Sequence, residues 1–531
     1  MKNLALFFIL FINLFITACG GGGGSSAENS EQIVAVKTTA QYASSMNING
    51  YGIEPATSYN ETSNNIYYLD ANSGDDVNGS GTSSNPWKSL SKIFNVMNSG
   101  DTVILRTGNY GRFSLNNSAN KSDWITFKAD TGNTPVIAGL ELNNTSLRDA
   151  YLRFDKIKFI VGGTNSTFGI DLRYVKNLEI RNSSIANSNH KYETDTAVRM
   201  NDAENILIYY SDISNANRGI SASNSKNITF SRNHIHVLGG GTAFHYAGGN
   251  SNFIIEKNNV YDSNFDTNDV DPSSPYTTAN PLGYPHSSAI SVRSNDIWIR
   301  GNIFHNIGSS SGIMFYNPDA AGGETAYNNI VIENNLFYDI ENPSVIRMYN
   351  LGQDVVVRNN TMIGHLRTDT TNANYRLRTA FVVHSLASGF DGSGLSVYNN
   401  IMVGSVNLPS TSNTANNIFW TYSLYNDPHN FLSRPPDIGS KILTSQAADY
   451  PINYFTANFF TGIDAENDFA AAHKLTLDFH LNVNSEAVYF GDINTQSSYS
   501  LGSINANGFI QDDGPVRDAE NYSVGAYQFT L

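Results

Sequence analysis

The sequence predicts an all-β fold, a parallel β-helix in which short strands stack coil upon coil as a solenoid. Charged residues make up only 15% of the 531 residues, while Gly, Tyr, Phe, Asn and Ser are abundant, which is typical of β-proteins with many turns. A polar residue followed by alternating apolar residues recurs in the middle of the chain, and the tightest copies are roughly 22 to 25 residues apart, the expected length of one coil. Asparagines at matching positions suit stacking of side-chain amides between coils.

Each copy of the repeat is predicted to hold two short strands separated by a tight polar turn. In the copy Ala289–Phe304, the first strand ends at Arg293 and the second strand follows Asp296. Leucine-rich repeats have a similar period, but their leucine pattern and helical segments are missing here. The aligned second strands are Asn177–Asn182, Asn205–Tyr210, Asn227–Arg232, Asn252–Lys257, Asp296–Gly301, Asn329–Asn334 and Asp354–Asn359.

The beginning of the chain has the features of an export signal. A basic start precedes an apolar run, Leu4–Ile16, that is too short to span a bilayer comfortably. Ile16-Thr17-Ala18-Cys19 resembles a bacterial lipobox, which implies cleavage before Cys19 and acylation of its thiol; a plain signal peptide is the alternative. We therefore expect a signal peptide at 1–18, a flexible tether at 19–64, and an outer-membrane lipoprotein, periplasmic or surface-facing, or a secreted protein.

The ordered part is expected to begin near Ile66, with the β-helix at 65–420 and its last coils and cap at 421–531. Leu90, Ile93, Phe94 and Met97 have helical spacing and predict a short helix over 89–97.

This opening resembles the N-terminal cap of right-handed parallel β-helix enzymes that act on polysaccharides. The resemblance lies in Pro86-Trp87-Lys88-Ser89-Leu90 and in the segment Gly100–Tyr110. Chondroitinase B, alginate lyases of polysaccharide lyase family 6 and pectate lyases of family 9 share this opening. The resemblance implies a right-handed solenoid with an N-terminal capping helix, and the segments Leu477–Leu481 and Val524–Phe529 imply a C-terminal cap.

The first strands of the repeat predict which side chains face outward. Alternate residues of a strand share a face, so the nearly always apolar first and third residues should enter the core. The strands are Ile170–Arg173, Val198–Asn201, Ile220–Ser223, Phe244–Ala247, Ile290–Arg293, Ile313–Tyr316, Ile346–Tyr349 and Phe381–His384. The second residues form one outward column: Asp171, Arg199, Ser221, His245, Ser291, Met314, Arg347 and Val382. The fourth residues form another: Arg173, Asn201, Ser223, Ala247, Arg293, Tyr316, Tyr349 and His384.

These columns suit β-elimination from a uronic acid, which requires a cation on the carboxylate, a base for the C5 proton and an acid for the leaving oxygen. Arginine can bind a carboxylate with two parallel hydrogen bonds, and Tyr or His can serve as acid or base. The candidate catalytic residues are Arg293, Tyr316, Arg347, Tyr349 and His245. The candidate substrate-binding residues are Arg199, His286 and His384. The sequence thus favours a lyase acting on an acidic polysaccharide of algal or plant type.

The chain departs from the lyase families that it resembles. Those families rely on a catalytic lysine, whereas no lysine lies between Lys257 and Lys441, so their catalytic residues cannot be carried over.

Three other functions stay open. A glycoside hydrolase needs two carboxylates; Glu193 and Asp195 would share a strand face, but the middle coils offer no such pair. A uronate C5-epimerase shares the first step of a lyase. A non-catalytic surface protein could use the same face to bind glycans. The net charge of −15 argues against nucleic acid as a partner, and we expect a monomer.

Insertions stretch three middle repeats, at 261–285, 318–327 and 366–378, and insertions on one side of a solenoid usually wall its binding face. The largest contains Asp262, Asp266, Asp269 and Asp271, which are candidate ligands for Ca²⁺ and otherwise form a solvated acidic loop. No other cofactor is expected.

Overall fold

A computed structural model describes residues 58–59, 63–116, 119–161, 168–187, 196–238, 242–263, 288–307, 311–316, 325–340, 344–364, 379–422, 432–433, 440–445, 460–462, 478–481 and 510. The chain divides into two compact units, residues 1–34 and 35–531. The first unit lies outside the described residues, and everything below concerns the second.

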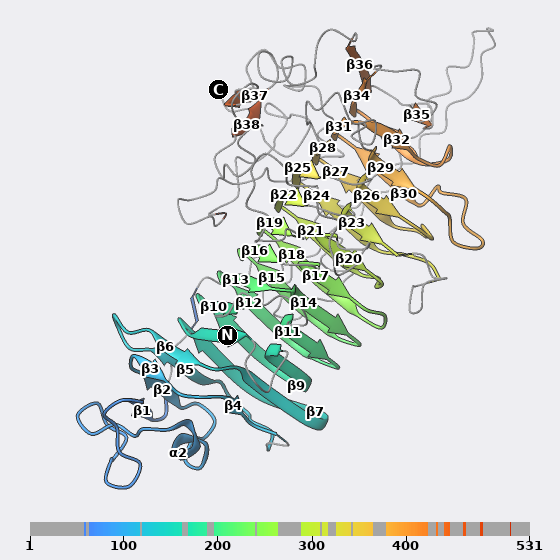
Figure 1. The fold of residues 1–531 in the computed structure, drawn as a ribbon. Coiled ribbons are helices and arrows are strands. Elements are labelled where there is room, and N and C mark those ends of the chain that lie inside the picture. The colour runs from blue at the N-terminus through green and yellow to red at the C-terminus, as the bar shows by residue number, and fades with distance from the viewer. Residues whose placement is uncertain are drawn as a thin grey trace, which may run out of the picture. The chain divides into compact units, whose positions relative to one another are not determined.

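The second unit is built from parallel strands that stack in chain order, as the prediction of a parallel β-helix requires (Figure 1). Each coil contributes three strands, and the predicted two strands per repeat were therefore wrong. One coil consists of β11 (Thr196–Asn201), β12 (Glu204–Tyr209) and β13 (Asp212–Ala216), and β14 (Arg218–Ser223) then pairs in parallel with β11. Only two residues lie between the end of the second strand and the start of the third, so the sequence pattern hides the turn between them.

The strands fall into three series. The first strands of successive coils are β4 (Phe113–Ser114), β7 (Leu140–Asp155), β9 (Phe168–Arg181), β11, β14, β17 (Phe244–Tyr246), β20 (Ile290–Val292), β23 (Ser311–Phe315), β26 (Ser344–Met348), β29 (Thr379–Val383), β32 (Ser405–Asn407) and β35 (Leu432–Ser433). The long strands β7 and β9 also supply the second strands of their coils.

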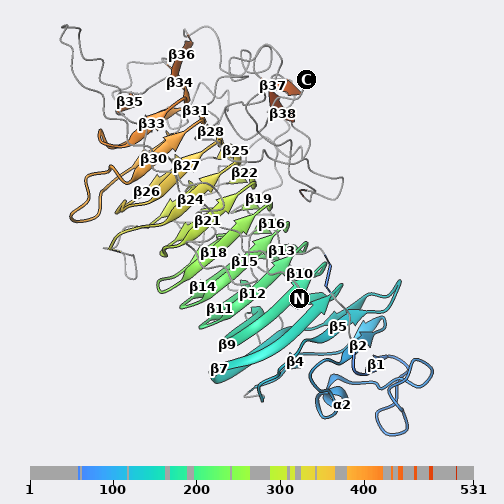
Figure 2. The ribbon, with the colours of Figure 1, turned by 180° about the vertical axis from the view of Figure 1, so that it is seen from behind.

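The second strands are β1 (Ile66–Leu69), β2 (Thr102–Leu105), β5 (Ile125–Ala129), β12, β15 (Lys226–Ser231), β18 (Ser251–Glu256), β21 (Ile297–Arg300), β24 (Ile330–Glu333), β27 (Val355–Arg358), β30 (Leu395–Tyr398) and β33 (Asn413–Ala415). The third strands form one 13-stranded parallel sheet. They are β3 (Gly108–Asn109), β6 (Pro135–Ile137), β8 (Lys158–Val161), β10 (Ser184–Asn187), β13, β16 (His234–Leu238), β19 (Asn259–Ser263), β22 (Ile303–Ile307), β25 (Leu336–Ile340), β28 (Thr361–Gly364), β31 (Ile401–Val403), β34 (Ile418–Tyr422) and β36 (Lys441–Ser445). The view from behind shows the same succession (Figure 2).

The core is a set of apolar rows that run from coil to coil along the solenoid. The first and third residues of every predicted first strand are buried, as expected from the alternation. Ile220, Phe244, Ile290 and Ile313 stack in register and are fully buried. Because like residues repeat about every 4.8 Å, each new coil covers the apolar edge that the previous coil leaves exposed.

Two ladders of asparagine amides hold the turns. The predicted ladder lies between first and second strands, where Asn205 donates to Asn177 and Asn227 donates to Asn205, both at 2.9 Å. These residues have positive φ, a conformation that Asn tolerates better than most residues. A second, fully buried ladder lies between second and third strands, with amide-to-carbonyl distances of 2.9 to 3.0 Å. Its members are Asn233, Asn258, Asn302, Asn335, Asn360, Asn400 and Asn417.

The N-terminal coil is capped by α2 (Leu90–Phe94), which is shorter than the predicted helix over 89–97. The Ser89 side chain accepts a hydrogen bond from the Lys92 amide at the helix start, and Leu90 and Ile93 are buried against the coil. No helix in the described ranges has the length and apolarity needed to span a membrane. At the other end, β37 (Phe460–Gly462) and β38 (Asp478–Leu481) form an antiparallel pair.

Several charged residues at the ends of the second strands are buried and paired with one another. Glu179 accepts hydrogen bonds from Arg153 and Arg181 at 2.7 and 2.8 Å, and Glu333 bonds Arg358 at 2.8 Å. Arg232, at the end of β15, donates to the carbonyl of Ile510, a fully buried residue 278 positions later. Residue 510 therefore contacts the coil that contains β15.

Candidate active site

The two outward columns of the first strands keep the predicted register across the insertions. His245 pairs with Ser291, Ser291 with Met314, and Met314 with Arg347, although residues 264–287 separate the strands of the first pair. In the other column, the amides of Tyr316, Tyr349 and His384 bond to the carbonyls of Val292, Phe315 and Met348 on the preceding coils. Arg293, Tyr316, Tyr349 and His384 therefore occupy successive coils at one level of the face.

Arg293 and Tyr316 lie next to each other on adjacent coils of this face. The Arg293 guanidinium lies over the Tyr316 ring, 4.5 Å from its centroid. Burial raises the pKa of the Tyr316 hydroxyl, and the neighbouring Arg293 and Ser291 oppose this rise without cancelling it. Tyr316 is therefore a neutral phenol near neutral pH, which is the state that can donate a proton.

His245 lies in the other column, on β17. Burial lowers its pKa to about 4, and the positive charges of Arg218 and Arg293 contribute to this lowering. The imidazole is therefore neutral at neutral pH, so that one ring nitrogen can accept a proton. Arg218, which also acts on the pKa of Tyr316, was missed in the sequence because it precedes the four aligned residues of its strand.

Arg347, Tyr349 and His384 form a second group on the adjacent coils. The Arg347 Nε–H donates to His384 Nε2 at 2.8 Å, so this ring nitrogen carries no proton. The Tyr349 and His384 rings stack at 4.7 Å and 12°, and the Arg347 guanidinium lies 5.4 Å from the Tyr349 centroid. Burial and the Arg347 charge lower the pKa of His384. The outer end of the group is accessible, since His384 is exposed.

Arg199, a predicted substrate-binding residue, lies on β11 with a carboxylate partner. Its Nε donates to Asp171 at 2.9 Å, and Arg173 bonds the same carboxylate. Within the predicted columns from β14 to β29, no Asp or Glu occurs at all. The columns therefore change along the solenoid, from two arginines that share one carboxylate at β9 and β11 to arginines without a carboxylate in the columns between β14 and β29.

Several predicted residues lie outside the described part of the chain: Cys19, Asp266, Asp269, Asp271 and His286. Asp262 belongs to the third strand β19, which runs to Ser263, and not to the insertion. The Ca²⁺ site and the lipid anchor stay predictions.

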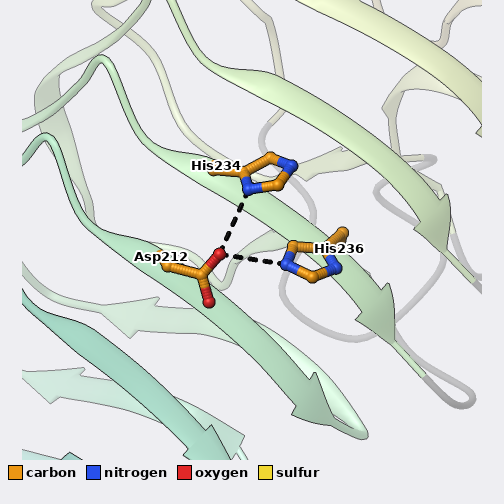
Figure 3. A group of neighbouring side chains, drawn as sticks. All are labelled: Asp212, His234 and His236. Carbon is orange, nitrogen blue, oxygen red and sulfur yellow. Dashed lines mark hydrogen bonds and ion pairs between the residues drawn. The ribbon is translucent and has the colours of Figure 1, made fainter. Parts of the chain in front are cut away.

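A group of side chains on the third strands was also missed. Asp212 on β13 faces His234 and His236 on β16, whose ring nitrogens lie 3.1 and 3.0 Å from the same carboxylate oxygen, Oδ2 (Figure 3). Burial opposes ionisation of Asp212, but the hydrogen bonds from the imidazoles outweigh it and hold the pKa of the carboxyl below its usual range. The spacing His-x-His on a strand, which places both rings on one face, was the signal in the sequence.

Comparison with known proteins agrees with the fold. Residues 136–280 match a family model described as "Right handed beta helix region". No curated protein matches the sequence significantly. The chain is thus, as predicted, a right-handed parallel β-helix.

Solved structures of polysaccharide-active enzymes are similar over much of the chain. They include the pectate lyase Pel9A (14% identity, 88% of this chain and 97% of that chain, TM-score 0.46). A PL6 alginate lyase in complex with a trisaccharide has 16% identity, with 73% and 85% coverage and a TM-score of 0.43. The GH136 lacto-N-biosidase from Eubacterium ramulus has 13% identity, with 72% and 68% coverage and a TM-score of 0.38. Identities and TM-scores this low do not identify an activity.

Proposed function

We propose that this protein is a polysaccharide lyase that cleaves a uronate-containing polymer by β-elimination on the face formed by its first strands. The observation that carries the proposal is the composition of the two outward columns between β14 and β29. They bring arginine, tyrosine and neutral histidine together on adjacent coils and contain no carboxylate. Such a face attracts a polyanion, and it holds both a proton acceptor and a proton donor.

Arg293 is assigned to the uronate carboxylate. Neutralising this carboxylate makes the C5 proton more acidic and stabilises the negative charge that develops when the proton leaves. A guanidinium suits this role because it stays charged and can form two parallel hydrogen bonds to a carboxylate.

His245 is assigned as the base and Tyr316 as the acid. The neutral imidazole takes the C5 proton, the electron pair forms the C4–C5 double bond, and the C4–O bond breaks. The Tyr316 hydroxyl protonates the leaving oxygen, which yields a new chain end and an unsaturated uronate. Proton transfer from the imidazolium to the phenolate, through solvent, restores both groups. The pKa shifts of both residues keep the imidazole unprotonated and the phenol protonated near neutral pH, which are the starting states that these roles require.

Arg347, Tyr349 and His384 are assigned to a neighbouring subsite. A polymer lying along the solenoid axis passes from the level of Arg293 to that of Arg347 in two coils, a distance of about 10 Å. This spacing is on the order of two sugar units, so Arg347 can hold the carboxylate of a second uronate. The flat pair of Tyr349 and His384 offers a surface for the apolar face of a sugar ring.

A glycoside hydrolase is less well supported. Its mechanism requires two carboxylates on either side of the scissile bond. In the predicted columns, Asp171 is the only carboxylate from β9 to β29, and it is paired with Arg199 and Arg173.

The test is incubation of the purified protein with alginate, pectate and other uronate polymers, followed by ultraviolet absorbance of the conjugated product. The expected result is an absorbance increase with one of these polymers, matched by an equal gain in reducing ends. Reducing ends without absorbance would replace the lyase by a hydrolase. Exchange of the C5 hydrogen with deuterated solvent, without cleavage, would replace it by an epimerase. Retention of the polymer without any chemical change would leave a binding protein.

We further propose that the mature chain is anchored by a lipid on Cys19. Labelling of the exported protein with a fatty-acid probe tests this: incorporation that disappears in Cys19→Ser supports the anchor, and equal labelling of both chains contradicts it.

A further inference from the structure

We propose that Asp212, His234 and His236 form a binding site for a transition-metal ion, with Zn²⁺ as the expected occupant. This site lies on the third strands and is separate from the residues assigned to catalysis. The three ligand atoms, Asp212 Oδ2, His234 Nδ1 and His236 Nε2, all lie within 4.8 Å of one another. They come from adjacent strands, with the carboxylate on β13 and both imidazoles on β16 (Figure 3).

The distances between the ligand atoms suit a small ion. Both nitrogen-to-oxygen distances are 3.0 to 3.1 Å. Two ligands at tetrahedral angles around Zn²⁺, each bound at about 2.0 to 2.1 Å, would be about 3.3 Å apart. The two nitrogen-to-oxygen contacts therefore need to change by only a few tenths of an ångström, and the two ring nitrogens, which lie within 4.8 Å of each other, must reach the same separation. In the metal site, the ion replaces the protons between the ring nitrogens and the carboxylate.

Neighbouring side chains already hold the ligands in place. The Ser214 hydroxyl donates to Asp212 Oδ1 at 3.1 Å, which leaves Oδ2 for the ion. The Tyr261 hydroxyl lies 3.0 Å from His234 Nε2. When Nδ1 binds the ion, Nε2 carries the proton and donates it to Tyr261, the kind of outer contact that fixes the orientation of histidine ligands.

The imidazole of His236 is fixed by stacking. Its ring stacks on the ring of Tyr261, at 5.2 Å and 12°, and contacts the ring of His234 at 4.3 Å, and the rings of His234 and Tyr261 also lie 5.2 Å apart. The stack continues through His305 to Tyr338 on the following coils. A site on paired strands with stacked rings needs little rearrangement when the ion binds.

The ligand set decides the kind of ion. Two imidazoles and one carboxylate favour Zn²⁺ and related ions over Ca²⁺ and Mg²⁺, which prefer oxygen ligands and higher coordination numbers. The side chains of Asp212 and His236 retain 33% and 20% of their exposure, so an ion has access and a fourth position remains for water. Bound there, the ion would link the coil of β13 to the coil of β16.

The test uses the full chain without a histidine tag, stripped with a chelator and titrated with Zn²⁺ in a calorimeter. One ion per chain is expected, together with a higher melting temperature, because the ion binds the folded state. His236→Ala should abolish this binding. Tyr261→Phe should weaken it by about 10- to 100-fold, the usual effect of losing an outer partner. His384→Gln, which changes a histidine on the first strands, is the matched control and should bind Zn²⁺ like the parent.

Other outcomes overturn the proposal. If the parent chain binds no Zn²⁺, the group is a hydrogen-bonded cluster only. If His234→Ala and His236→Ala bind Zn²⁺ like the parent, the ion lies elsewhere. If an equal concentration of Ca²⁺ or Mg²⁺ displaces the bound Zn²⁺, the imidazoles are not the ligands. None of these results bears on lyase activity, which is measured separately.

Discussion

The outward faces of the first and second strands both carry charged and phenolic side chains, but they place them in opposite environments. On the second strands, Glu333 is 1% exposed and Arg358 is 1% exposed, and the two are hydrogen-bonded to each other. On the first strands, Arg347 is only partly buried, and within the described residues it has no carboxylate partner. Its guanidinium donates to a neutral imidazole instead.

This difference separates a structural use of charge from a functional one. The two charges of a buried ion pair satisfy each other, and removing one partner leaves the other buried without compensation. Such a pair is not accessible to a ligand. Arg347 contacts a neutral imidazole and a phenol ring, so an anionic ligand can approach it and supply a counter-charge. Charged residues on two faces of one solenoid can therefore have different roles, which substitutions and changes of pH and salt can test.

The largest effect is expected for the acid on the first strands. Tyr316→Phe removes the proton donor and should lower kcat by about 10²- to 10⁴-fold with little change in melting temperature. Tyr209→Phe makes the same change on the second strands, where the ring lies beside Arg181, and should leave kcat unchanged. Initial rates of ultraviolet absorbance measure both. Full activity of Tyr316→Phe would remove this residue from the mechanism.

The next largest effect is expected from two arginine substitutions. Arg358→Met leaves Glu333 buried without its cation and should cost about 3–5 kcal/mol in the free energy of unfolding. Arg347→Met should change this free energy by less than about 0.5 kcal/mol and instead raise KM. Denaturant titrations measure the first quantity and steady-state kinetics the second.

A second substitution tests whether the lost stability comes from the buried charge of Glu333. Glu333→Gln in the Arg358→Met background should recover part of the lost stability, because a neutral amide needs no cation and still accepts from Trp298 Nε1. If Arg358→Met were as stable as the parent, the buried ion pair on the second strands would not have the structural role assigned to it.

The pH dependence of both stability and activity should follow the protonation of His245. Its pKa is about 4 in the folded chain and about 6.5 in the unfolded chain, so the folded state binds fewer protons between these values. The stability that depends on neutral His245 is complete above pH of about 6.5 and is lost as the pH falls through about 4. Activity should fall in the same acidic limb, since the protonated ring cannot act as base.

Arg218→Gln tests the cause of this shift. Removing a positive charge beside His245 should raise the pKa of the imidazole and move the acidic limb of kcat/KM to higher pH. His245→Asn provides the control for stability, because its unfolding free energy should lack this dependence. A limb that stays in place in Arg218→Gln would show that another group controls it.

The smallest effect is expected from salt. Interactions of partly exposed charges are screened over about 10 Å at 0.1 M ionic strength, whereas buried pairs are screened much less. KM for the polymer should therefore rise with salt, while the unfolding free energy that depends on Glu333 and Arg358 should change little. A KM independent of salt would argue against binding of the polymer by Arg293 and Arg347.

The register of the first strands could be predicted because a slip by one residue would expose the core. If Ile290 and Val292 turned outward, the polar Ser291 and the cationic Arg293 would enter the apolar interior. This penalty fixes the pairing of His245 with Ser291 in spite of the long insertion between them. The asparagine ladder between the first and second strands could also be predicted from the sequence. The same turn geometry recurs in each coil and therefore places asparagine at matching positions.

Other parts of the site depend on contacts that the repeat pattern does not encode. The third strands follow the second after a turn of two residues, so Asp212, His234 and His236 were not recognised as neighbours. Arg218 lies just outside the aligned positions, yet it reaches the surroundings of both His245 and Tyr316. The contact between Arg232 and Ile510 joins residues 278 positions apart.

The sequence by itself determined the solenoid, the inward rows and the two outward columns of the first strands, because alternation and period are local properties that every coil repeats. Only the tertiary structure decided which charges are neutralised and which remain available to a ligand. It paired Arg199 with Asp171, buried Arg358 against Glu333 and brought Asp212 to His234 and His236. The reason is that pairing and burial depend on which coils and which distant segments meet in space, and a pattern read along one chain does not contain this information.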